Sequence, residues 1–396
     1  MSCLATKDPE ASQARPTVNS IARKYGPAYL KKYKDRMSAD QVKTLFALMS
    51  CRSEDGAMMI YHCKSCHKTH VVPKSCGNRH CPTCQTDKAK KWLEKQLERK
   101  LPCPYFMITF TVPATFRKFA RSHPRECYAA LFEAAKETLI ALAKDPRFIG
   151  SSKIGMTAVL HTWGRNLCYH LHLHFIVPGG AVSEDGQAWL ASGAKFFVPV
   201  HAASKLFRGK YRAIMKRIGL LEQIDSRVWR QEWVVHSKPV GDGTESLKYL
   251  APYVYRVAIS NRRIIKVVDH PDGTGEVTYS YRPSGTHKYK RMTVSAEEFL
   301  RRFLQHVLPS GLRKVRHYGF MNPRSRFRPS WLRMLVTVTL NEEYQLIVPD
   351  PTTWPKPPKK SMLCDECGGE LRFSRMIPSH RRWIDITGPP KATSVS

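Results

Sequence analysis

The chain has 396 residues, which is long enough for two or three domains with hydrophobic cores. Its 65 Lys and Arg residues against 32 Asp and Glu residues give a net charge of +33, which is typical of a protein that binds a polyanion, most often nucleic acid. Because we find neither an apolar run of about 18 residues nor a signal peptide, we expect no membrane partner and a cytoplasmic, nucleoid-associated protein.

The N-terminal part of the chain is predicted to be helical after a disordered start. Residues 1–17 lack a hydrophobic pattern, so we expect them to be disordered. Ser38 and Gln41 have the spacing of a capping box, which predicts a helix through Leu45, Phe46 and Met49.

A cysteine-rich stretch follows, "YHCKSCHKTHVVPKSCGNRHCPTCQ". It contains two Cys-x-x-Cys knuckles, and each knuckle can supply two thiolates to one tetrahedral ion, so a zinc ribbon is predicted with the ligands Cys63, Cys66, Cys81 and Cys84. Further candidates nearby form either a second zinc site or buried thiols with a surface imidazole; they are Cys51, Cys76 and His80. The basic residues around the ribbon suit a DNA contact, and a purely structural zinc is equally compatible.

Alternating helix and strand patterns continue beyond the ribbon. "TDKAKKWLEKQLERKL" has apolar residues at helical spacing, "YFMITFTVP" is typical of a strand, and the apolar positions from 128 to 142 predict an amphipathic helix. The next stretch, "LHTWGRNLCYHLHLHFIVPGG", holds four of the sixteen histidines of the chain.

Period-two alternation explains this histidine stretch as a β-hairpin. His170, His172 and His174 fall on one face of the second strand, while Leu171, Leu173, Phe175 and Val177 form a core face. The preceding strand, "GMTAVLHTW", places His161 close to that histidine face if the two strands pair. Clustered imidazoles are a common ligand set for metals, so a metal site is predicted here.

The remaining elements complete an α+β pattern around an antiparallel sheet. "RRIIKVV" and "GEVTYSYR" predict a second hairpin, and Ser295 with Glu298 predicts a capped helix. A Pro-rich linker, "VPDPTTWPKPPKK", precedes a tail with one more knuckle, Cys364-x-x-Cys367. Two cysteines cannot complete a tetrahedral site, so His380 or ligands from elsewhere in the chain are needed for a zinc ion in the tail.

One further stretch, "ESLKYLAPYVYRVAISNRR", holds two tyrosines four residues apart. In a helix Tyr249 and Tyr253 share a face. Pro252 would cost about 3 kcal/mol inside a helix, so a single helix through the stretch is not required by the pattern. The alternative role of the two tyrosines is packing.

Taken together, these motifs resemble a known family, the zinc-ribbon, two-tyrosine transposases of rolling-circle insertion sequences, within the HUH (His-hydrophobic-His) endonuclease superfamily. The resemblance runs from about residue 20 to residue 340. It is carried by "SCGNRHCPTCQ", "HTWGRNLCYHLHLHFIVPGG", "YLAPYVYRVAISN" and "FLRRFLQHVLPSGLRKVRHYGF".

The resemblance implies a five-stranded antiparallel sheet with flanking helices, with the metal histidines on a central strand and the tyrosines on a facing helix. It divides the chain into four parts: a disordered N-terminus at 1–17, a helical zinc-binding and DNA-binding domain at 18–100, an HUH nuclease domain at 101–345, and a linker and tail at 346–396.

The resemblance also implies an activity. Tyr249 or Tyr253 would attack a phosphate of single-stranded or hairpin DNA at an element end, leaving a 5′-phosphotyrosine link and a free 3′-OH that allow strand transfer without ATP. His172 and His174 match the HUH motif, and His161 is favoured over His170 as the third ligand of Mg²⁺ or Mn²⁺, although imidazoles alone also suit zinc.

Several basic and amide residues are candidates for DNA contacts. Arg256 and Arg262 follow the tyrosines. Asn261 and Arg316, with His317, either contact phosphates, orient the site or are ordinary surface residues. Three other interpretations stay open: a plasmid-type replication initiator with the same nicking chemistry, a zinc-ribbon protein that binds nucleic acid without catalysis, and a decayed transposase. The target site and oligomeric state are not predicted.

Overall fold

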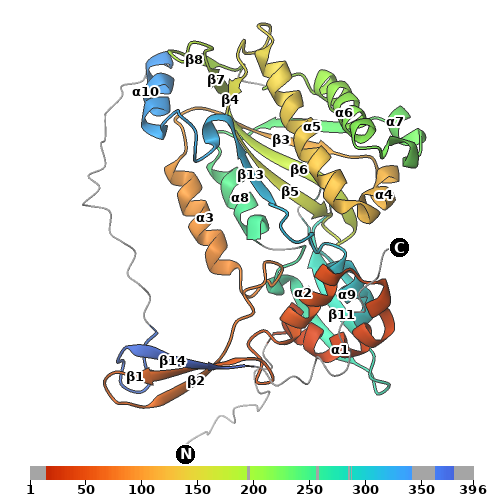
Figure 1. The fold of residues 1–396 in the computed structure, drawn as a ribbon, viewed down its shortest axis with the longest axis vertical. Coiled ribbons are helices and arrows are strands. Elements are labelled where there is room, and N and C mark those ends of the chain that lie inside the picture. Colours follow the sequence, from red (N-terminus) through yellow and green to blue (C-terminus); the bar gives the residue numbers. More distant parts are fainter. Residues whose placement is uncertain are drawn as a thin grey trace, which may run out of the picture.

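The computed structural model in Figure 1 describes residues 15–193, 197–255, 258–283, 286, 288–340 and 362–378. Two expectations therefore lie outside the described residues: the disorder of residues 1–14 and the Pro-rich linker, which falls within 341–361. Residues 15–17 are described, and the Thr17 hydroxyl caps the first helix by accepting from the Ser20 N–H.

The largest sheet has five strands in the order β13-β5-β6-β3-β9, and each neighbouring pair is antiparallel. β6 is therefore the central strand. The family-based prediction of a five-stranded antiparallel sheet within an α+β fold is confirmed. The strands are β3 (Tyr105–Thr111), β5 (Met156–Trp163), β6 (Tyr169–Pro178), β9 (Val234–Pro239) and β13 (Val315–Tyr318).

One face of this sheet is covered by helices and forms the main hydrophobic core. Leu171, Leu173, Phe175 and Val177 of β6 are fully buried there, as their alternation predicted. Phe207 of α6 meets Phe110 of β3 edge-to-face, with 5.0 Å between ring centroids. The helices in this layer are α4 (Arg117–Ser122), α5 (Pro124–Lys144), α6 (Val200–Arg217) and α7 (Arg227–Arg230).

The opposite face of the sheet carries a second apolar cluster. Val159 of β5 and Ile176 of β6 pack there with Leu250 of α8, Trp92 of α3 and Val336 of α10. A small sheet in the order β4-β7-β8 extends this region. These elements are α3 (Thr86–Glu98), α8 (Thr244–Tyr255), α10 (Pro329–Thr339), β4 (Lys153–Ile154), β7 (Gly180–Val182) and β8 (Trp189–Ala191).

A separate core joins the N-terminal helices to a segment from the second half of the chain. Leu45, Leu48, Phe299 and Phe303 are buried together there. The predicted capping of α2 by Ser38 and of α9 by Ser295 is confirmed, as is the β10–β11 hairpin. The elements are α1 (Val18–Tyr33), α2 (Ala39–Met49), β10 (Ile264–Asp269), β11 (Gly275–Tyr281), β12 (Lys290–Ser295) and α9 (Ala296–Leu304).

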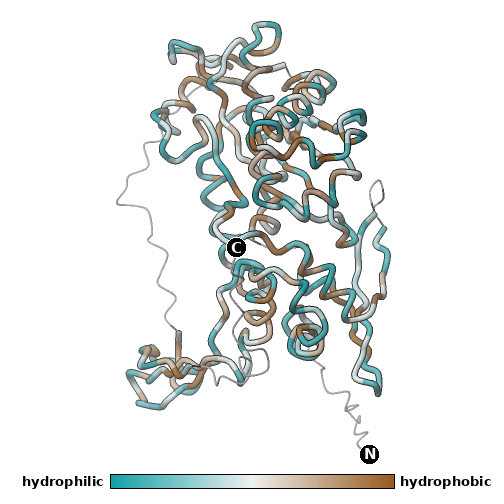
Figure 2. Tube along the Cα trace, turned by 45° about the vertical axis from the view of Figure 1, so that its right-hand side comes forward, coloured by the Kyte–Doolittle hydropathy of each residue, from teal (hydrophilic) through white to brown (hydrophobic). Residues whose placement is uncertain are grey.

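A further three-stranded sheet, in the order β14-β1-β2, stands apart from these cores (Figures 1 and 2). Its strands are β1 (Met58–Cys63), β2 (Thr69–Pro73) and β14 (Leu371–Ile377). β14 comes from the C-terminal segment and pairs with β1 in the N-terminal part. In the part of the chain that the structure describes, no helix is long and apolar enough to span a membrane.

Two buried histidines hold α9 and the segment after it in place. His306 lies with one ring nitrogen 3.3 Å from the Thr162 hydroxyl and the other 3.1 Å from the Leu167 carbonyl oxygen. The His80 ring accepts a hydrogen bond from the Leu308 N–H at 3.0 Å. Burial lowers the pKa of each of these histidines to about 3, so both stay neutral at neutral pH.

These neutral histidines predict a loss of stability in mild acid. The folded-state pKa lies below the unfolded value, so protons bind the unfolded chain first, and stability falls as the pH drops below about 6.5. From pH 7 to pH 5 each such histidine costs about 2 kcal/mol. We expect the stability difference between wild type and His306→Gln, measured by denaturant unfolding, to shrink by that amount at pH 5.

The matched control is His201→Gln, because His201 is exposed on α6. Its effect on the unfolding free energy should be the same at both pH values. An unchanged difference for His306→Gln would show that His306 is not held neutral by the fold.

Candidate active site and metal centres

Pairing of β5 with β6 brings three histidines together on the face opposite the main core. His161 of β5 lies directly across from His172 of β6, and His174 is paired with Val159 on the same side. All three side chains are buried. The candidate ligand nitrogens of His161, His172 and His174 lie within 4.8 Å of one another, so small side-chain rotations suffice for all three to contact one ion.

The surroundings of these imidazoles favour metal binding. Burial lowers the pKa of His174 to about 4 and those of His161 and His172 well below their usual value, so the rings are neutral at neutral pH. His172 Nδ1 lies 2.9 Å from the His170 carbonyl oxygen, and His174 Nδ1 lies 2.9 Å from the Thr109 hydroxyl. These contacts hold the two rings so that Nε2 is the atom directed away from them, as in many metal-bound histidines.

His170 lies at the edge of this group and has a different partner. Its Nδ1 is 2.9 Å from a guanidinium nitrogen of Arg117 on α4. Burial lowers the pKa of His170 to about 4, with the nearby charge of Arg117 as a second cause. His170 is not part of the three-histidine cluster, so the arrangement favours His161 as the third ligand.

Helix α8 covers the histidine face of the sheet and carries the two candidate tyrosines. Leu247, Leu250 and Val254 form its buried stripe. The helix runs unbroken through Pro252, so the single helix that the sequence pattern left open is present. Burial of this apolar stripe supplies the stabilisation that offsets the lost backbone hydrogen bond.

Tyr249 is 44% exposed on α8, so solvent and a ligand can reach it. Tyr253 follows one helical turn later, and its side chain lies outside the described residues.

Val254 lines a cavity of about 460 Å³ together with Lys314 and His317. Lys314 lies over the Trp163 ring at 4.4 Å, and Trp163 stacks on His161 with 4.8 Å between centroids. The cavity beside the C-terminal half of α8 is therefore bordered by Lys314, which contacts His161 through Trp163.

The structure places the candidate DNA-contacting residues in different environments. Arg262 is exposed next to the end of α8, while Arg256 lies outside the described residues. Asn261 is a structural residue: its side chain accepts from the Val18 N–H at 3.1 Å and donates to the Thr83 hydroxyl at 3.1 Å. Both ends of the Asn261 amide are engaged within the fold, which favours a structural role for Asn261 over a phosphate contact.

Arg316 lies on the other face of the sheet from the three histidines. Its guanidinium lies 3.9 Å from the centre of the Phe132 ring of α5, on the main-core face of the sheet. Alternation along β13 directs residue 316 away from the histidines and residue 317 towards them. His317 accordingly contacts the Thr157 hydroxyl at 3.0 Å, one strand from β6.

A basic groove beside the histidines was missed by the sequence analysis. It has a volume of about 430 Å³, lies between α4 and α9, and connects to the cluster through the Arg117–His170 contact. Five of its lining residues are basic: Arg117, Lys118, Arg121, Arg301 and Arg302. The two contributing segments lie far apart in the sequence, so only the general excess of positive charge could have hinted at the groove.

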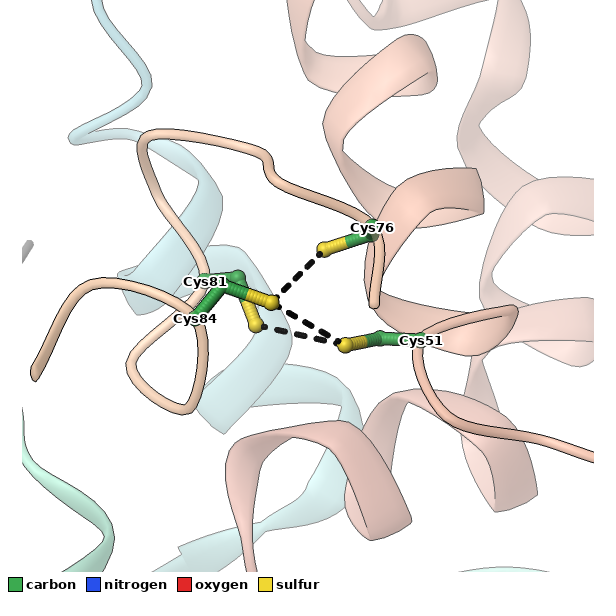
Figure 3. A group of neighbouring side chains, drawn as sticks. All are labelled: Cys51, Cys76, Cys81 and Cys84. Carbon is green, nitrogen blue, oxygen red and sulfur yellow. Dashed lines mark hydrogen bonds between the residues drawn. The ribbon is translucent and has the colours of Figure 1, made fainter. Parts of the chain in front are cut away.

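Eight cysteines form two groups of four, and the predicted pairing of knuckles is wrong. Cys81 and Cys84 meet Cys51 and Cys76, whose thiols converge in Figure 3. Sulfur–sulfur distances in this group are 3.4 Å for Cys51–Cys84, 3.7 Å for Cys76–Cys84 and 3.7 Å for Cys51–Cys81. Hydrogen bonds from Cys51 and Cys76 lower the pKa of the Cys81 thiol far below its usual value.

The other group joins Cys63 and Cys66 to Cys364 and Cys367. The sulfurs are 3.4 Å apart for Cys63–Cys367 and 3.8 Å apart for Cys66–Cys364. Sequence spacing could not reveal this set, because neighbouring knuckles in the sequence belong to different groups. β1 and β2 carry Cys63 and Cys66 away from Cys81 and Cys84, which pack against the helical core instead. His380 lies outside the described residues.

Both groups have the donor chemistry of zinc. A tetrahedral ion with Zn–S bonds of about 2.3 Å requires sulfurs about 3.8 Å apart, close to the observed separations. His80 is not a ligand in this arrangement, because its ring accepts from the Leu308 N–H and approaches the Thr44 hydroxyl at 3.5 Å. Residues 21–112 match the family model described as a transposase zinc-binding domain.

Other comparisons agree with this match. Residues 155–328 match a family model described as a putative transposase, with the short name Y2_Tnp. The chain is 37% identical over 335 residues to putative transposase y4qJ of Sinorhizobium fredii, covering 80% of this chain and 82% of the relative. It is 24% identical over 370 residues to the transposase for insertion sequence element IS801 of Pseudomonas savastanoi pv. phaseolicola, covering 85% and 84%. No solved structure matches.

The contacts of Asn261 predict a structural effect of its removal. Asn261→Ala leaves the Val18 N–H and the Thr83 hydroxyl without their partner, so the free energy of unfolding should fall by about 1–3 kcal/mol. Binding of single-stranded DNA at a temperature where the variant is folded should be unchanged. Arg262→Ala is the matched control, and its effect on stability should stay within about 0.5 kcal/mol. The assignment fails if Asn261→Ala weakens DNA binding without a change in stability.

Proposed function

Since the chain belongs to the insertion-sequence transposases that carry a zinc-binding domain, we propose that it cuts and joins single-stranded DNA through a tyrosine on α8 and a divalent ion held by His161, His172 and His174. The observation that carries the proposal is the position of three buried, neutral imidazoles on the sheet face that α8 covers. DNA is the partner, as expected of a transposase.

Each group has a defined task in this reaction. The phenol oxygen of Tyr249 or Tyr253 forms a bond to phosphorus while the bond from phosphorus to the 3′ oxygen breaks. The phenol proton is lost and the 3′ oxygen takes up a proton, so the products are a 5′-phosphotyrosine and a 3′-OH. A tyrosine with a pKa near 10 is mostly protonated at neutral pH, and a protonated phenol is a weak nucleophile. The reaction therefore requires activation of the phosphate that the phenol attacks.

A divalent ion at this site would supply that activation, since a bound cation stabilises negative charge that develops on a phosphate. The histidines would hold the ion because their rings are neutral and because contacts at Nδ1 orient His172 and His174. Two tyrosines one turn apart let a second strand transfer begin while the first covalent link persists. We favour Mg²⁺ or Mn²⁺ from the family resemblance.

The groove between α4 and α9 supports a path for the DNA backbone. Its five basic side chains lead away from His170 at the edge of the histidine cluster. Lys118 and Arg121 are exposed, whereas Arg301 and Arg302 form ion pairs with Glu298. Exposed cations bind phosphates without reading sequence. In this proposal Arg262 also contacts the strand near the end of α8.

Tyrosine nucleophiles predict a covalent protein–DNA adduct. Purified protein with labelled single-stranded element ends and Mg²⁺ or Mn²⁺ should form an adduct that survives a denaturing gel. Tyr249→Phe and Tyr253→Phe should each retain part of it, and the double variant should lose it. His172→Ala should reduce the adduct by at least about 100-fold, since removal of a ligand lowers metal affinity or activity.

Tyr289→Phe is the matched control, because Tyr289 is 69% exposed and lies outside α8. It should form adduct at the wild-type level. Absence of an adduct with either ion, from a protein that still binds the DNA, would favour the non-catalytic nucleic-acid-binding protein. Adduct formation without joining of two element ends to a new target would favour a replication initiator.

The groove predicts a salt-dependent affinity. Lys118→Ala/Arg121→Ala should weaken binding of single-stranded DNA and lower the slope of log affinity against log salt by about 1.4, or about 0.7 per phosphate contact. Arg147→Ala/Arg227→Ala removes the same charge at sites already paired with Asp145 and Asp225, and should leave the slope unchanged. Equal effects of the two double variants would mean that the groove has no special role.

A further inference from the structure

The four-cysteine group on the separate sheet is not assigned by the family match. The zinc-binding domain match covers residues 21–112, and Cys364 and Cys367 lie far beyond it. We propose that Cys63, Cys66, Cys364 and Cys367 bind a second zinc ion, and that this ion fastens the C-terminal segment of the chain to the N-terminal hairpin. The inference concerns metal content and chain connectivity, and does not rest on the cleavage chemistry.

The two knuckles of this group have the same local conformation. The residue after the second cysteine has a left-handed backbone in both, with φ of 58° at His67 and 70° at Gly368. Backbone N–H groups point at the sulfurs: the Ser65 N–H lies 3.4 Å from Cys63 Sγ, and the Gly369 N–H lies 3.4 Å from Cys367 Sγ. Such N–H donors stabilise thiolates, which are the form of cysteine that binds metal.

A positive φ directly after a cysteine also occurs in the cysteine group that packs against the helical core. Arg52 and Gly77 directly follow Cys51 and Cys76, and they have φ values of 52° and 61°. A positive φ is uncommon for residues such as Arg and His, because their Cβ is crowded in this conformation. Its occurrence after a cysteine in both groups indicates that the two groups are built for the same kind of ligand.

Contacts beyond the cysteines hold the two distant segments in register. β14 pairs with β1 from Met58–Ile377 to Cys63–Leu371. The Lys64 N–H donates to the Glu370 carbonyl oxygen at 3.0 Å, and the side chains of the same two residues form an ion pair. Lys68 forms a second ion pair with Glu366 of the other knuckle. The segments therefore have complementary charges as well as complementary edges.

This sheet is too thin to be held by a hydrophobic core. Every β14 residue except Leu371 is exposed, and Phe373 is 50% exposed even though it contacts the Tyr61 ring. Protein units of this size usually depend on a metal or on disulfides. The sulfur–sulfur distances of 3.4 Å for Cys63–Cys367 and 3.8 Å for Cys66–Cys364 exceed the length of a disulfide bond, about 2.05 Å. They match the spacing of sulfurs around one tetrahedral zinc ion.

His70 supports the site from outside the four sulfurs. Its Nε2 lies 3.3 Å from Cys364 Sγ, and its Nδ1 lies 3.3 Å from a carboxylate oxygen of Asp365. Hydrogen-bonded neighbours of this kind orient metal ligands. The link spans 298 residues between Cys66 and Cys364, so the five-stranded sheet and α8 lie within a loop that this ion closes.

The first test counts zinc in the purified full chain by elemental analysis. Cys364→Ser/Cys367→Ser should contain one zinc ion fewer per chain than wild type. Because this group lies outside the three hydrophobic cores, the main thermal transition should be unchanged. Cys103→Ser/Cys168→Ser removes two cysteines outside both groups and should keep the wild-type zinc content.

The second test asks whether the ion holds the tail in place. A protease site introduced between residues 346 and 358 separates the C-terminal segment from the rest of the chain. After cleavage under reducing conditions, the released segment should co-elute with the body in size exclusion, and it should dissociate when a chelator is added. In the Cys364→Ser/Cys367→Ser background it should dissociate without chelator.

The proposal is overturned if the tail variant keeps the wild-type zinc content. It is also overturned if the cleaved segment leaves the body regardless of zinc, or if it stays bound in chelator and in the cysteine variant alike. Disulfides would be identified instead if no zinc is lost on substitution and the wild type lacks four titratable thiols, two of which, those of Cys63 and Cys66, become titratable in the variant. None of these outcomes depends on formation of the protein–DNA adduct, so they test the zinc site independently of the proposed nuclease activity.

Discussion

The antiparallel register of β5 against β6 is the constraint on which the rest of the site depends. It places His161 across from His172 and brings His174 onto the same face, while the alternate residues of both strands enter the main core. A shift of one residue would turn every imidazole into that core and every leucine out of it. Burial of Leu171, Leu173 and Phe175 therefore specifies the register, and the register positions the histidines.

Burial also sets the chemistry of those histidines. The same packing that covers the sheet face with α8 keeps the rings neutral, and neutral imidazole is the form that binds a metal. The continuous helix through Pro252 serves this arrangement, since its buried stripe presses against β5 and β6 while Tyr249 stays accessible. The buried stripe and the exposed Tyr249 thus lie on opposite sides of one helix.

The cysteines solve a different problem, that of joining parts of the chain that share little apolar surface. One group ties the Cys81–Cys84 loop to α1 and α2, where Asn19 contacts both Cys81 and the Leu48 carbonyl oxygen. The other lies on a thin sheet whose strands come from both ends of the described chain. Two ion pairs, Lys64–Glu370 and Lys68–Glu366, join the segments of this sheet, and the proposed metal–thiolate bonds would add to them.

The sequence by itself determined the local features: the histidine alternation, the capped helices at Ser38 and Ser295, the six candidate thiol ligands between residues 51 and 84, and the excess of positive charge. These depend on short-range periodicity, which a strand or helix preserves. Only the tertiary structure decided which cysteines share a group, that Asn261 is structural, that Arg316 lies on the opposite face, and that α4 and α9 form a basic groove. Each of these depends on contacts between segments far apart in the chain, and residue spacing carries no information about them.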